Sequence, residues 1–468
     1  MGKQKQRIVI QNLSITGYAA GGKAVAHDNG KVIFVTGAIP GDSADILITK
    51  NKKDWAEGTA ISIITPSPER LIPFCRHFGI CGGCKWQMLP YALQLQYKWQ
   101  EVQANFEKIG KVPIPDILPI IGSDLTKAYR NKLEFTISNK RYLTTSEIGS
   151  DREILQQNAL GYHAPNVFDK VLDISECWLM DDVNNTIRNT VREISILNHF
   201  THYDIRQHTG WLRNIIIRLS TTGELMVNIC INYENEPDLK ILMDGLLEKV
   251  PSITTLVFTI NPKWNDSIYD LTPQVYFGSG YITETLGNFR FLISPKSFFQ
   301  TNTYQAEKLY KVVQNFACLT GKEIVYDLYC GTGSIGIFLS TLALKIIGVE
   351  TIGEAVEDAR KNAELNNINH AEFFSGDVIK VCNSNFFTTH GRPDVVITDP
   401  PRAGMHQTLI DKLLEITPPR IVYVSCNTAT QARDIQLLSE KYTVEKIQPV
   451  DMFPHTHHIE CVVALTAK

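Results

Sequence analysis

Apolar and polar side chains alternate with a period of two through residues 7–65, as in RIVIQNLSITGY and KVIFVTGAIPG, and glycines interrupt the runs. Successive side chains of a strand point to opposite faces, and glycine marks the turns between strands. The pattern therefore predicts a small all-β barrel. The polar, proline-rich stretch ITPSPERLIP that follows predicts a linker.

The periodicity changes twice after this linker. Apolar positions recur every three or four residues in YALQLQYKWQEVQANFEKIG (91–110), which predicts one amphipathic helix stopped by Gly110. Short apolar runs such as GWLRNIIIRLS and ITTLVFTIN predict a β-rich region over roughly 128–290. From residue 323 onward apolar strands alternate with amphipathic helices, which is typical of an α/β fold.

The α/β region begins with EIVYDLYCGTGSIG (323–336), which predicts a strand, a glycine turn and the start of a helix. Gly331, Gly333 and Gly336 leave room for a ligand against the backbone, and the helix start offers unpaired N–H groups. Asp327 precedes the glycines by four positions, unlike the dinucleotide pattern G-x-G-x-x-G. The alternative is a purely structural strand–helix turn.

Polar residues end the later strands of this region. Glu350 ends KIIGVE, Asp399 follows PDVVIT, and Cys426 follows RIVYVS. Open α/β sheets bind ligands at the carboxyl edge, so we expect these side chains to line a site there. Glu350 stands 23 residues after Asp327, where an acidic side chain can accept both hydroxyls of a ribose.

Length and composition place the chain among multi-domain globular proteins. With 468 residues, 44% hydrophobic and 20% charged, two or three domains are expected. The longest apolar runs have the length of strands, so we expect no transmembrane helix. The start MGKQKQRIVIQN lacks the apolar centre of a signal peptide, which predicts a cytoplasmic protein.

The formal net charge of −3 is unevenly distributed. Residues 1–140 carry 18 Lys and Arg against 11 Asp and Glu, a net charge of +7, and the remainder carries −10. A basic front part favours contact with a polyanion such as RNA. A solvated surface without a partner is the alternative.

Ten cysteines in a cytoplasmic protein favour metal ligands, nucleophiles or buried thiols over disulfides. Cys75, Cys81 and Cys84 follow the spacing C-x5-C-x2-C in a glycine-rich loop, and Cys177 is the candidate for a fourth ligand. Both zinc and an iron–sulfur cluster accept four cysteines. Zinc ribbons prefer two C-x2-C pairs, so we favour a [4Fe–4S] cluster; unligated structural thiols are the alternative.

Two segments resemble known domains. VTGAIPGDSADILITKNKKDWAEG resembles the TRAM domain, an OB-like barrel that binds RNA, which would use Lys50, Lys52, Lys53 and Trp55 for phosphate and stacking contacts. The alternative is a generic barrel with a lysine-rich hairpin. Asp-x-x-x-Gly-x-Gly resembles the first motif of Rossmann-like S-adenosylmethionine methyltransferases.

DLYCGTG, GVE, GD, DPPRAG, VSCN-x-x-T-x-x-RD, FFQTN and PHTHHIE together form a more specific set. With them the chain resembles the RNA 5-methyluridine methyltransferases, closest to the bacterial 23S rRNA (uracil-5-)-methyltransferases that carry a TRAM domain and a [4Fe–4S] cluster. The resemblance implies a TRAM barrel (1–66), a central β-rich iron–sulfur domain (67–90 and 128–290) and a Rossmann-like methyltransferase domain (91–127 and 291–468).

The family's pattern also assigns residues. It implies Cys426 as nucleophile and Glu460 as base. Thr428 stands where the family usually has proline, and Ser334 where some members have asparagine, which makes the Ser334 contact the least secure. The residues implied to surround S-adenosylmethionine are Gln300, Tyr329, Ser334, Glu350, Asp377 and Asp399.

This chemistry needs those residue types. Carbon-5 of uracil is a weak nucleophile, and a thiolate that adds to carbon-6 places electron density on carbon-5. A base must then remove the carbon-5 proton so that the thiolate can leave. We expect the helix after Asn427, capped by Thr428 or Thr430, to stabilise the thiolate. Asp399 would also hold the uracil edge and Arg402 a phosphate or a neighbouring base.

Several alternatives stay open at this stage. The RNA could be tRNA rather than 23S rRNA, or the chain could bind RNA through its TRAM domain and cluster without catalysis. Cys426 could be a buried strand-end thiol and Glu460 a surface residue. His455, His457 and His458 lack the partner spacing of a metal site. We expect RNA as the partner, no membrane contact, and a monomer.

Overall fold

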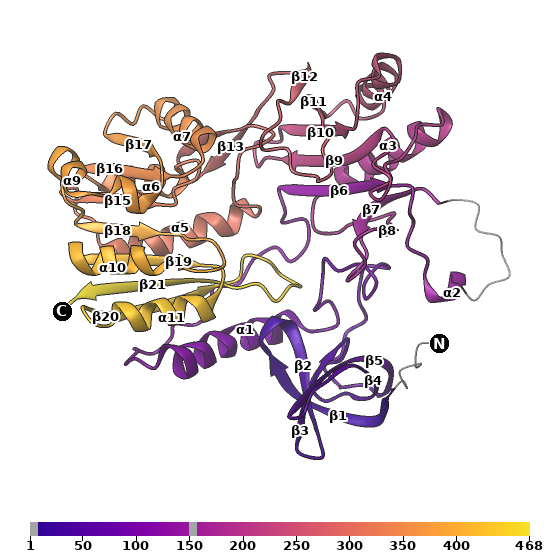
Figure 1. The fold of residues 1–468 in the computed structure, drawn as a ribbon, viewed down its shortest axis with the longest axis horizontal. Coiled ribbons are helices and arrows are strands. Elements are labelled where there is room, and N and C mark those ends of the chain that lie inside the picture. Colours follow the sequence, from indigo (N-terminus) through magenta and orange to yellow (C-terminus); the bar gives the residue numbers. More distant parts are fainter. Residues whose placement is uncertain (1–7, 149–156) are drawn as a thin grey trace.

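Five strands close into a barrel at the N-terminal end of the computed structural model, which describes residues 8–148 and 157–468 (Figure 1). The inward side chains Ile15, Ile33, Val35 and Ile46 fill it. The barrel predicted from the alternating pattern is confirmed. Its strands are β1 (Val9–Ala19), β2 (Lys23–Asp28), β3 (Lys31–Thr36), β4 (Ser43–Asn51) and β5 (Trp55–Thr65), and a short turn, η1 (Ala20–Gly22), joins β1 to β2.

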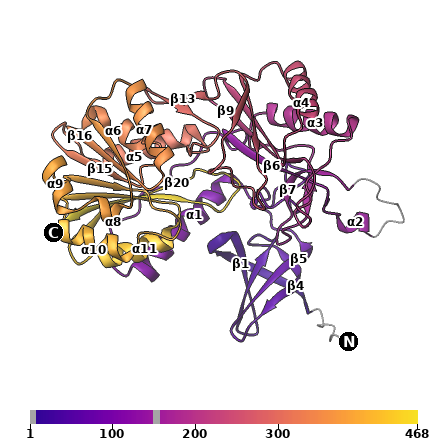
Figure 2. The same cartoon turned by 45° about the horizontal axis from the view of Figure 1, so that its top comes forward.

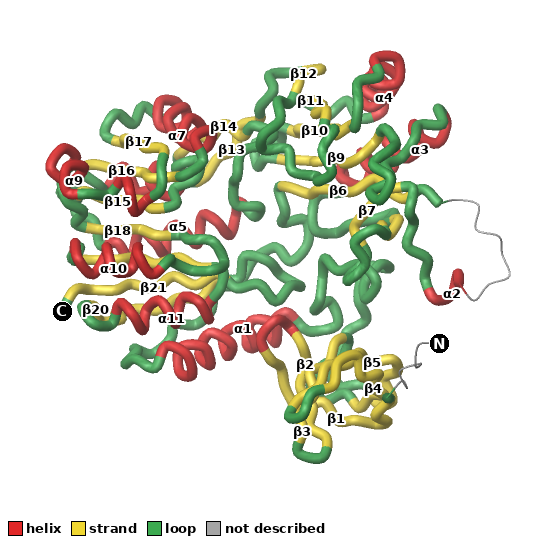
Figure 3. The backbone as a smooth tube through the Cα atoms, viewed as in Figure 1, coloured by secondary structure: helices red, strands yellow, loops and turns green. Residues whose placement is uncertain are grey.

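The helix predicted over 91–110 forms, with a change of geometry at its end. Helix α1 (Tyr91–Asn105) continues into one π-helical turn, η2 (Phe106–Gly110), and Lys111 then ends it in the left-handed conformation. Val102 and Phe106 are fully buried against the C-terminal domain. In Figures 1 and 3, α1 runs along the underside of that domain, and its right-hand end lies next to the barrel.

The central region is one mixed sheet with two helices on one face. The strands stand in the order β12-β11-β10-β9-β6-β7-β8. Helices α3 (Val183–Leu197) and α4 (Glu236–Lys249) share a hydrophobic cluster with Phe135, Ile215 and Ile229 of the sheet. The strands are β6 (Lys132–Ser138), β7 (Ala159–His163), β8 (Val171–Asp173), β9 (Leu212–Leu219), β10 (Leu225–Ile231), β11 (Thr255–Ile260) and β12 (Gln274–Phe277), and a short helix, α2 (Thr145–Ile148), lies between β6 and β7.

The C-terminal region is the predicted α/β fold. Its sheet has the order β17-β16-β15-β18-β19-β21-β20, in which the first five strands are parallel and β21 runs antiparallel to both of its neighbours, β19 and β20. Helices cover both faces (Figure 2). The strands are β15 (Ile324–Leu328), β16 (Lys345–Glu350), β17 (Ala371–Ser375), β18 (Val395–Thr398), β19 (Arg420–Ser425), β20 (Tyr442–Val450) and β21 (Glu460–Ala467). The helices are α5 (Thr303–Ala317), α6 (Ser334–Leu339), η3 (Ser340–Leu342), α7 (Gly353–Leu365), α8 (Val378–Val381), α9 (Ser384–His390), α10 (Gln407–Ile416) and α11 (Thr428–Leu438).

A two-stranded sheet joins the central and C-terminal regions. Its strands, β13 (Ile282–Leu286) and β14 (Phe289–Ile293), place Leu286 and Phe291 in the hydrophobic core of the C-terminal domain. The sequence pattern grouped this segment with the central region up to residue 290, whereas its packing ties it to the α/β fold. No helix within the described residues combines the length and apolarity needed to cross a bilayer.

A buried ion pair fixes α1 to the segment that precedes β21. Lys98 Nζ lies 2.6 Å from Asp451 Oδ1, and both side chains are fully buried. Asp451 also accepts hydrogen bonds from Tyr91 Oη (2.7 Å) and from the backbone N–H of Phe453 (3.0 Å). A buried charge is tolerated only when it is paired and hydrogen-bonded, so this arrangement holds the segment from Asp451 onward in one place.

Replacing Lys98 by methionine is expected to destabilise the protein by about 3 kcal/mol, because it leaves the Asp451 carboxylate buried without its counter-charge. The measurement is the urea unfolding midpoint. Lys108→Met, at an exposed position of η2, is the matched control and should change stability by less than about 0.5 kcal/mol. Equal midpoints for the two variants would contradict the role given to the pair.

Candidate active site and cysteine cavity

The candidate site lies at the carboxyl edge of the parallel strands. The chain runs from β15 outward through β16 to β17 and then returns to β18 on the other side of β15, which makes this edge a topological switch point. The parallel strands therefore deliver their terminal residues side by side. These residues are Asp377 after β17, Glu350 at the end of β16, Tyr329 after β15, Asp399 after β18 and Cys426 after β19.

The glycine turn after β15 leaves space for a ligand. Gly331 and Gly333 have φ values of 54° and 75°, and a Cβ atom on Gly331 would meet no atom within 4 Å. A Cβ on Gly336 would come within 3.1 Å of Asp327 Oδ2, which accepts the Gly336 N–H at 2.9 Å. Gly336 is thus required for packing, and the open space lies over Gly331.

Asp327 is a candidate that the residue assignments from sequence left out. Its Oδ1 atom is buried and has no hydrogen-bond partner among the described residues. Burial raises the pKa of its carboxyl to about 7. A buried polar atom without a partner beside an open turn is suited to a ligand that supplies the missing hydrogen bond. Its place in the motif DLYCGTG was the available signal.

Glu350 is held by the backbone around it. Its carboxylate accepts hydrogen bonds from Gly331 N–H (3.1 Å), Ile352 N–H (3.0 Å) and Thr351 Oγ1 (3.2 Å). A carboxylate has about four acceptor positions, so one stays available for a ribose hydroxyl. Asp377 caps α8 through Oδ1, which accepts the Ile379 N–H at 3.0 Å.

The remaining residues expected at the cofactor, Ser334, Tyr329 and Gln300, differ in the contacts that they already make within the protein. The Ser334 hydroxyl is engaged with Tyr310 Oη at 2.8 Å, so its direct contact with a cofactor stays a prediction. Tyr329 has a φ of 62°, and burial raises its pKa. The backbone carbonyl of Gln300 accepts a hydrogen bond from Asn131 Nδ2 at 2.8 Å, which fixes this segment against β6.

These features fit S-adenosylmethionine. The open glycine turn can lie against the ligand, Glu350 has capacity for a ribose, and Asp377 has a second oxygen for an exocyclic amine. The orphaned Asp327 oxygen adds an acceptor at the same edge.

Sheet register brings Cys426 and Glu460 together. Strand β21 runs antiparallel beside β19, and Ser425 pairs with Cys461. The next positions along the two strands are therefore Cys426 and Glu460. Gln431 of α11 donates to the carbonyls of Tyr423 (2.9 Å) and Cys461 (3.0 Å), which clamps the two strands just below this pair.

Burial and carboxyl groups set the proton affinities here. Burial, Glu460 and Asp399 raise the pKa of the Cys426 thiol to about 11, while Arg402 lowers it. Burial raises the pKa of Asp399 to about 7, and burial and then Asp399 raise that of Glu460 well above its usual range. Burial is the largest of these effects on the thiol, and it favours the protonated form. The expected stabilisation of a thiolate by the following helix stays a prediction.

The helix after Cys426 is capped by a different residue than expected. Asn427 Oδ1 accepts the N–H groups of Ala429 (3.1 Å) and Thr430 (3.4 Å), whereas Thr428 Oγ1 accepts from Asn105 Nδ2 of α1 at 2.7 Å. Asparagine is among the preferred N-cap residues. The cap fixes the backbone directly after the thiol.

The segment between Asp451 and Glu460 connects the site to the rest of the protein. The His455 carbonyl accepts the N–H groups of Lys85 (2.8 Å) and Trp86 (3.0 Å), next to Cys84. Arg402 Nη2 lies 3.4 Å from His458 Nδ1. Burial lowers the pKa of His458 to about 4, so it is neutral at pH 7.

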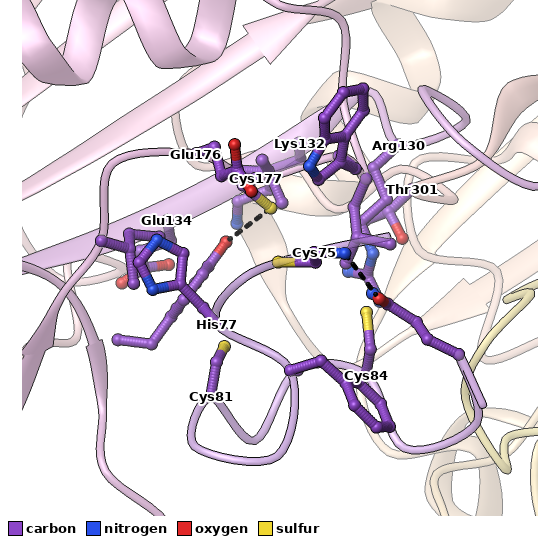
Figure 4. Close-up of a pocket in the computed structure, with 18 residues that line it drawn as sticks. Cys75, His77, Cys81, Cys84, Arg130, Lys132, Glu134, Glu176, Cys177 and Thr301 are labelled. Carbon is purple, nitrogen blue, oxygen red and sulfur yellow. Dashed lines mark hydrogen bonds between the residues drawn. The ribbon is translucent and has the colours of Figure 1, made fainter. Parts of the chain in front are cut away.

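The four cysteines expected as ligands line one cavity of about 380 Å³ (Figure 4). Cys75, Cys81 and Cys84 come from the loop after the linker, and Cys177 comes from the segment after β8. Tyr162 Oη lies 3.7 Å from Cys177 Sγ. Burial raises the pKa of Cys81 to about 11 and that of Cys84 to about 12.

The four thiols of this cavity are donors that both expected groups use. Within residues 8–148 and 157–468, no three His, Cys, Asp or Glu side chains form a group that could hold a metal ion. In a [4Fe–4S] cluster each thiolate would bind a different iron.

Comparisons with known proteins agree with this architecture. Residues 272–468 match the family model described as tRNA (uracil-5-)-methyltransferase, and residues 4–61 match that of the TRAM domain. A protein named an uncharacterized RNA methyltransferase from Bacteroides thetaiotaomicron is 52% identical over 96% of this chain and 99% of its own. A protein of the same name from Porphyromonas gingivalis is 46% identical over 97% of this chain and 99% of its own.

Among solved structures, the Pyrococcus abyssi tRNA (uracil-54, C5)-methyltransferase in complex with S-adenosyl-L-homocysteine is similar along the whole chain. It is 27% identical, with a TM-score of 0.72, and the match covers 98% of this chain and 100% of that one. The chain therefore belongs to the family of S-adenosylmethionine-dependent RNA (uracil-5-)-methyltransferases.

Proposed function

We propose that this protein methylates carbon-5 of one uridine in RNA through a covalent bond between Cys426 and carbon-6 of the base. Our first candidate for the substrate is 23S rRNA. The observation that carries the proposal is the register of β19 and β21, which sets Cys426 beside Glu460. A nucleophile and a base in adjacent positions are what addition at carbon-6 and proton removal at carbon-5 require. We further propose that the protein acts as a monomer in the cytoplasm.

The thiol must lose its proton before or during the addition. At a pKa of about 11 only a small fraction of Cys426 is thiolate at neutral pH. Asp399, whose pKa burial raises to about 7, is our candidate for taking this proton. Arg402, which lowers the pKa of the thiol, favours the same ionisation.

The later steps use the second carboxyl group. S-adenosylmethionine, when bound, supplies an electrophilic methyl group, and Gln300, Tyr329, Ser334, Glu350, Asp377 and Asp399 are our candidates for holding it. The carbon-5 electron pair would bond to this methyl group as the methyl–sulfur bond breaks, and the sulfur would keep that bond's electron pair and leave as S-adenosylhomocysteine. Glu460 in its ionised form then takes the carbon-5 proton, and the carbon–sulfur bond breaks to release Cys426. A carboxyl with a raised pKa is a strong base once ionised.

RNA must present an unstacked base to this site. The TRAM barrel carries Lys50 4.7 Å above the ring of Trp55, at the turn between β4 and β5. Lys52 and Lys53 lie in the same turn. Cations beside an aromatic ring suit a single-stranded backbone and a stacked base, which supports the expected role of this turn in RNA binding.

Transfer RNA is the second candidate substrate. The structurally similar Pyrococcus abyssi protein is a tRNA enzyme, and the match includes nearly all of this chain. The barrel and cysteine loop therefore do not by themselves separate a ribosomal from a transfer RNA substrate.

Mapping 5-methyluridine in RNA from a strain without this protein tests the function. We expect one 5-methyluridine in 23S rRNA to disappear and to return with the wild-type gene but not with Cys426→Ala. Cys318→Ala, which removes an exposed thiol, is the control and should restore it fully. Loss of a tRNA methylation instead would select the second substrate, and an unchanged map would contradict the function.

We infer that the cysteine cavity binds a [4Fe–4S] cluster through Cys75, Cys81, Cys84 and Cys177. The soft thiol donors and the cavity volume support this inference. Metal binding would displace the thiol protons that burial otherwise retains.

Protein purified without oxygen is expected to contain iron and acid-labile sulfide in equal amounts and little zinc. Cys84→Ser should lose most of both, because it removes one of four ligands, while Cys318→Ala should keep them. Elemental analysis with a sulfide assay measures this. Stoichiometric zinc without sulfide would contradict the cluster.

A further inference from the structure

A second cavity, separate in its lining from the candidate active site, lies between the central sheet and the segment that leads to Gln300. Its volume is about 260 Å³. Lys132 and Glu134 of β6, Ile216 of β9, Tyr269, and Pro295 form much of its wall. Lys132 and Glu134 also line the cysteine cavity of Figure 4, so the two spaces adjoin.

Two opposite charges stand at the wall of this cavity, the half-buried Lys132 and the exposed Glu134. Lys132 and Glu134 point to the same face of β6 because they are two positions apart. Neither side chain forms a hydrogen bond or a salt bridge within the described part of the chain. The other charged groups of the wall are paired: Lys296 with Glu354 at 2.7 Å and Asp266 with Arg213 at 2.9 Å.

The strand register sets Lys132 between a like charge and an opposite one, because Arg218 lowers its pKa and Glu134 raises it. Lys132 lies directly opposite Arg218 of β9, and like charges in that relation are destabilising. Desolvation in the cavity lowers the pKa of Lys132 and raises that of Glu134. Both charged forms would gain from a ligand that accepts a hydrogen bond beside Lys132 and donates beside Glu134.

Guanine matches this pattern better than the other bases. Its O6 atom can accept from the Lys132 ammonium while N1–H and the 2-amino group donate to both oxygens of Glu134. Uracil and cytosine offer the carboxylate only one donor group beside an acceptor, and adenine has no carbonyl for the lysine. Tyr269, which is 56% exposed, supplies a ring on which a base can stack.

We propose that this cavity binds an unpaired guanine of the substrate RNA, held by Lys132 and Glu134, and so helps to select the uridine that is methylated. The inference rests on the proposed function. Pro295 is five residues before Gln300, so the chain spans at most about 18 Å between the cavity wall and this residue expected at the cofactor. The Asn131 N–H donates to the Thr301 carbonyl at 2.9 Å and fixes β6 to this segment.

The test uses a transcript that carries the uridine identified by mapping. Each guanine within about six nucleotides is replaced singly by inosine, which lacks the 2-amino group. We expect one replacement to lower kcat/KM of the wild-type enzyme at least about tenfold, the effect of losing a hydrogen bond to a charged group. Glu134→Ala should be less active on the unmodified RNA and insensitive to that same replacement.

Thr136→Val, the next residue on the same face but outside the cavity wall, is the matched control and should keep the wild-type response. If Glu134→Ala melts at a lower temperature than Thr136→Val, Glu134→Gln replaces it. A wild-type enzyme indifferent to every inosine, or a Glu134 variant that keeps the full penalty, would overturn the inference. A transcript that the wild-type enzyme does not methylate would instead contradict the proposed function.

Discussion

The structure depends on one antiparallel pairing in an otherwise parallel part of a sheet. The parallel strands β15 to β19 end at one edge of the sheet, and each brings the residue at its carboxyl end to that edge. Strand β21 enters the same edge from the opposite direction, so its first residue, Glu460, meets the last position of β19. Two functional groups thereby come from adjacent strands at a single point.

The segment before Glu460 is held from three sides. The Lys98–Asp451 pair ties it to α1, the Lys85 and Trp86 N–H groups tie His455 to the cysteine loop, and Asn302 Nδ2 donates to the Met452 carbonyl at 2.9 Å. These contacts connect the cysteine loop to the segment that ends at Glu460, the proposed base. This arrangement gives the cysteine loop a structural reason to lie near the active site.

Strand ends were predictable from sequence because parallel strands in alternating α/β segments must share an edge. Glu350, Asp377, Asp399 and Cys426 could be placed by that rule alone. The contact of Lys98 with Asp451 could not, because 353 positions separate them and no local pattern pairs them. The proton affinity of Cys426 also required the structure, because it depends on the burial of the thiol and on two carboxyl groups, Glu460 and Asp399, that fold close to it.

The central claim is that Cys426 and Glu460 act in sequence on one base, and Glu460→Gln tests it most directly. Without the base, the carbon-5 proton stays and the thiol cannot leave, so turnover should fall at least about a hundredfold while methylated RNA accumulates on the protein. Mass spectrometry of the digested adduct should find the base on Cys426, and Cys426→Ala combined with Glu460→Gln should form none. Normal turnover without an adduct in Glu460→Gln, or an adduct on another residue, would contradict the account.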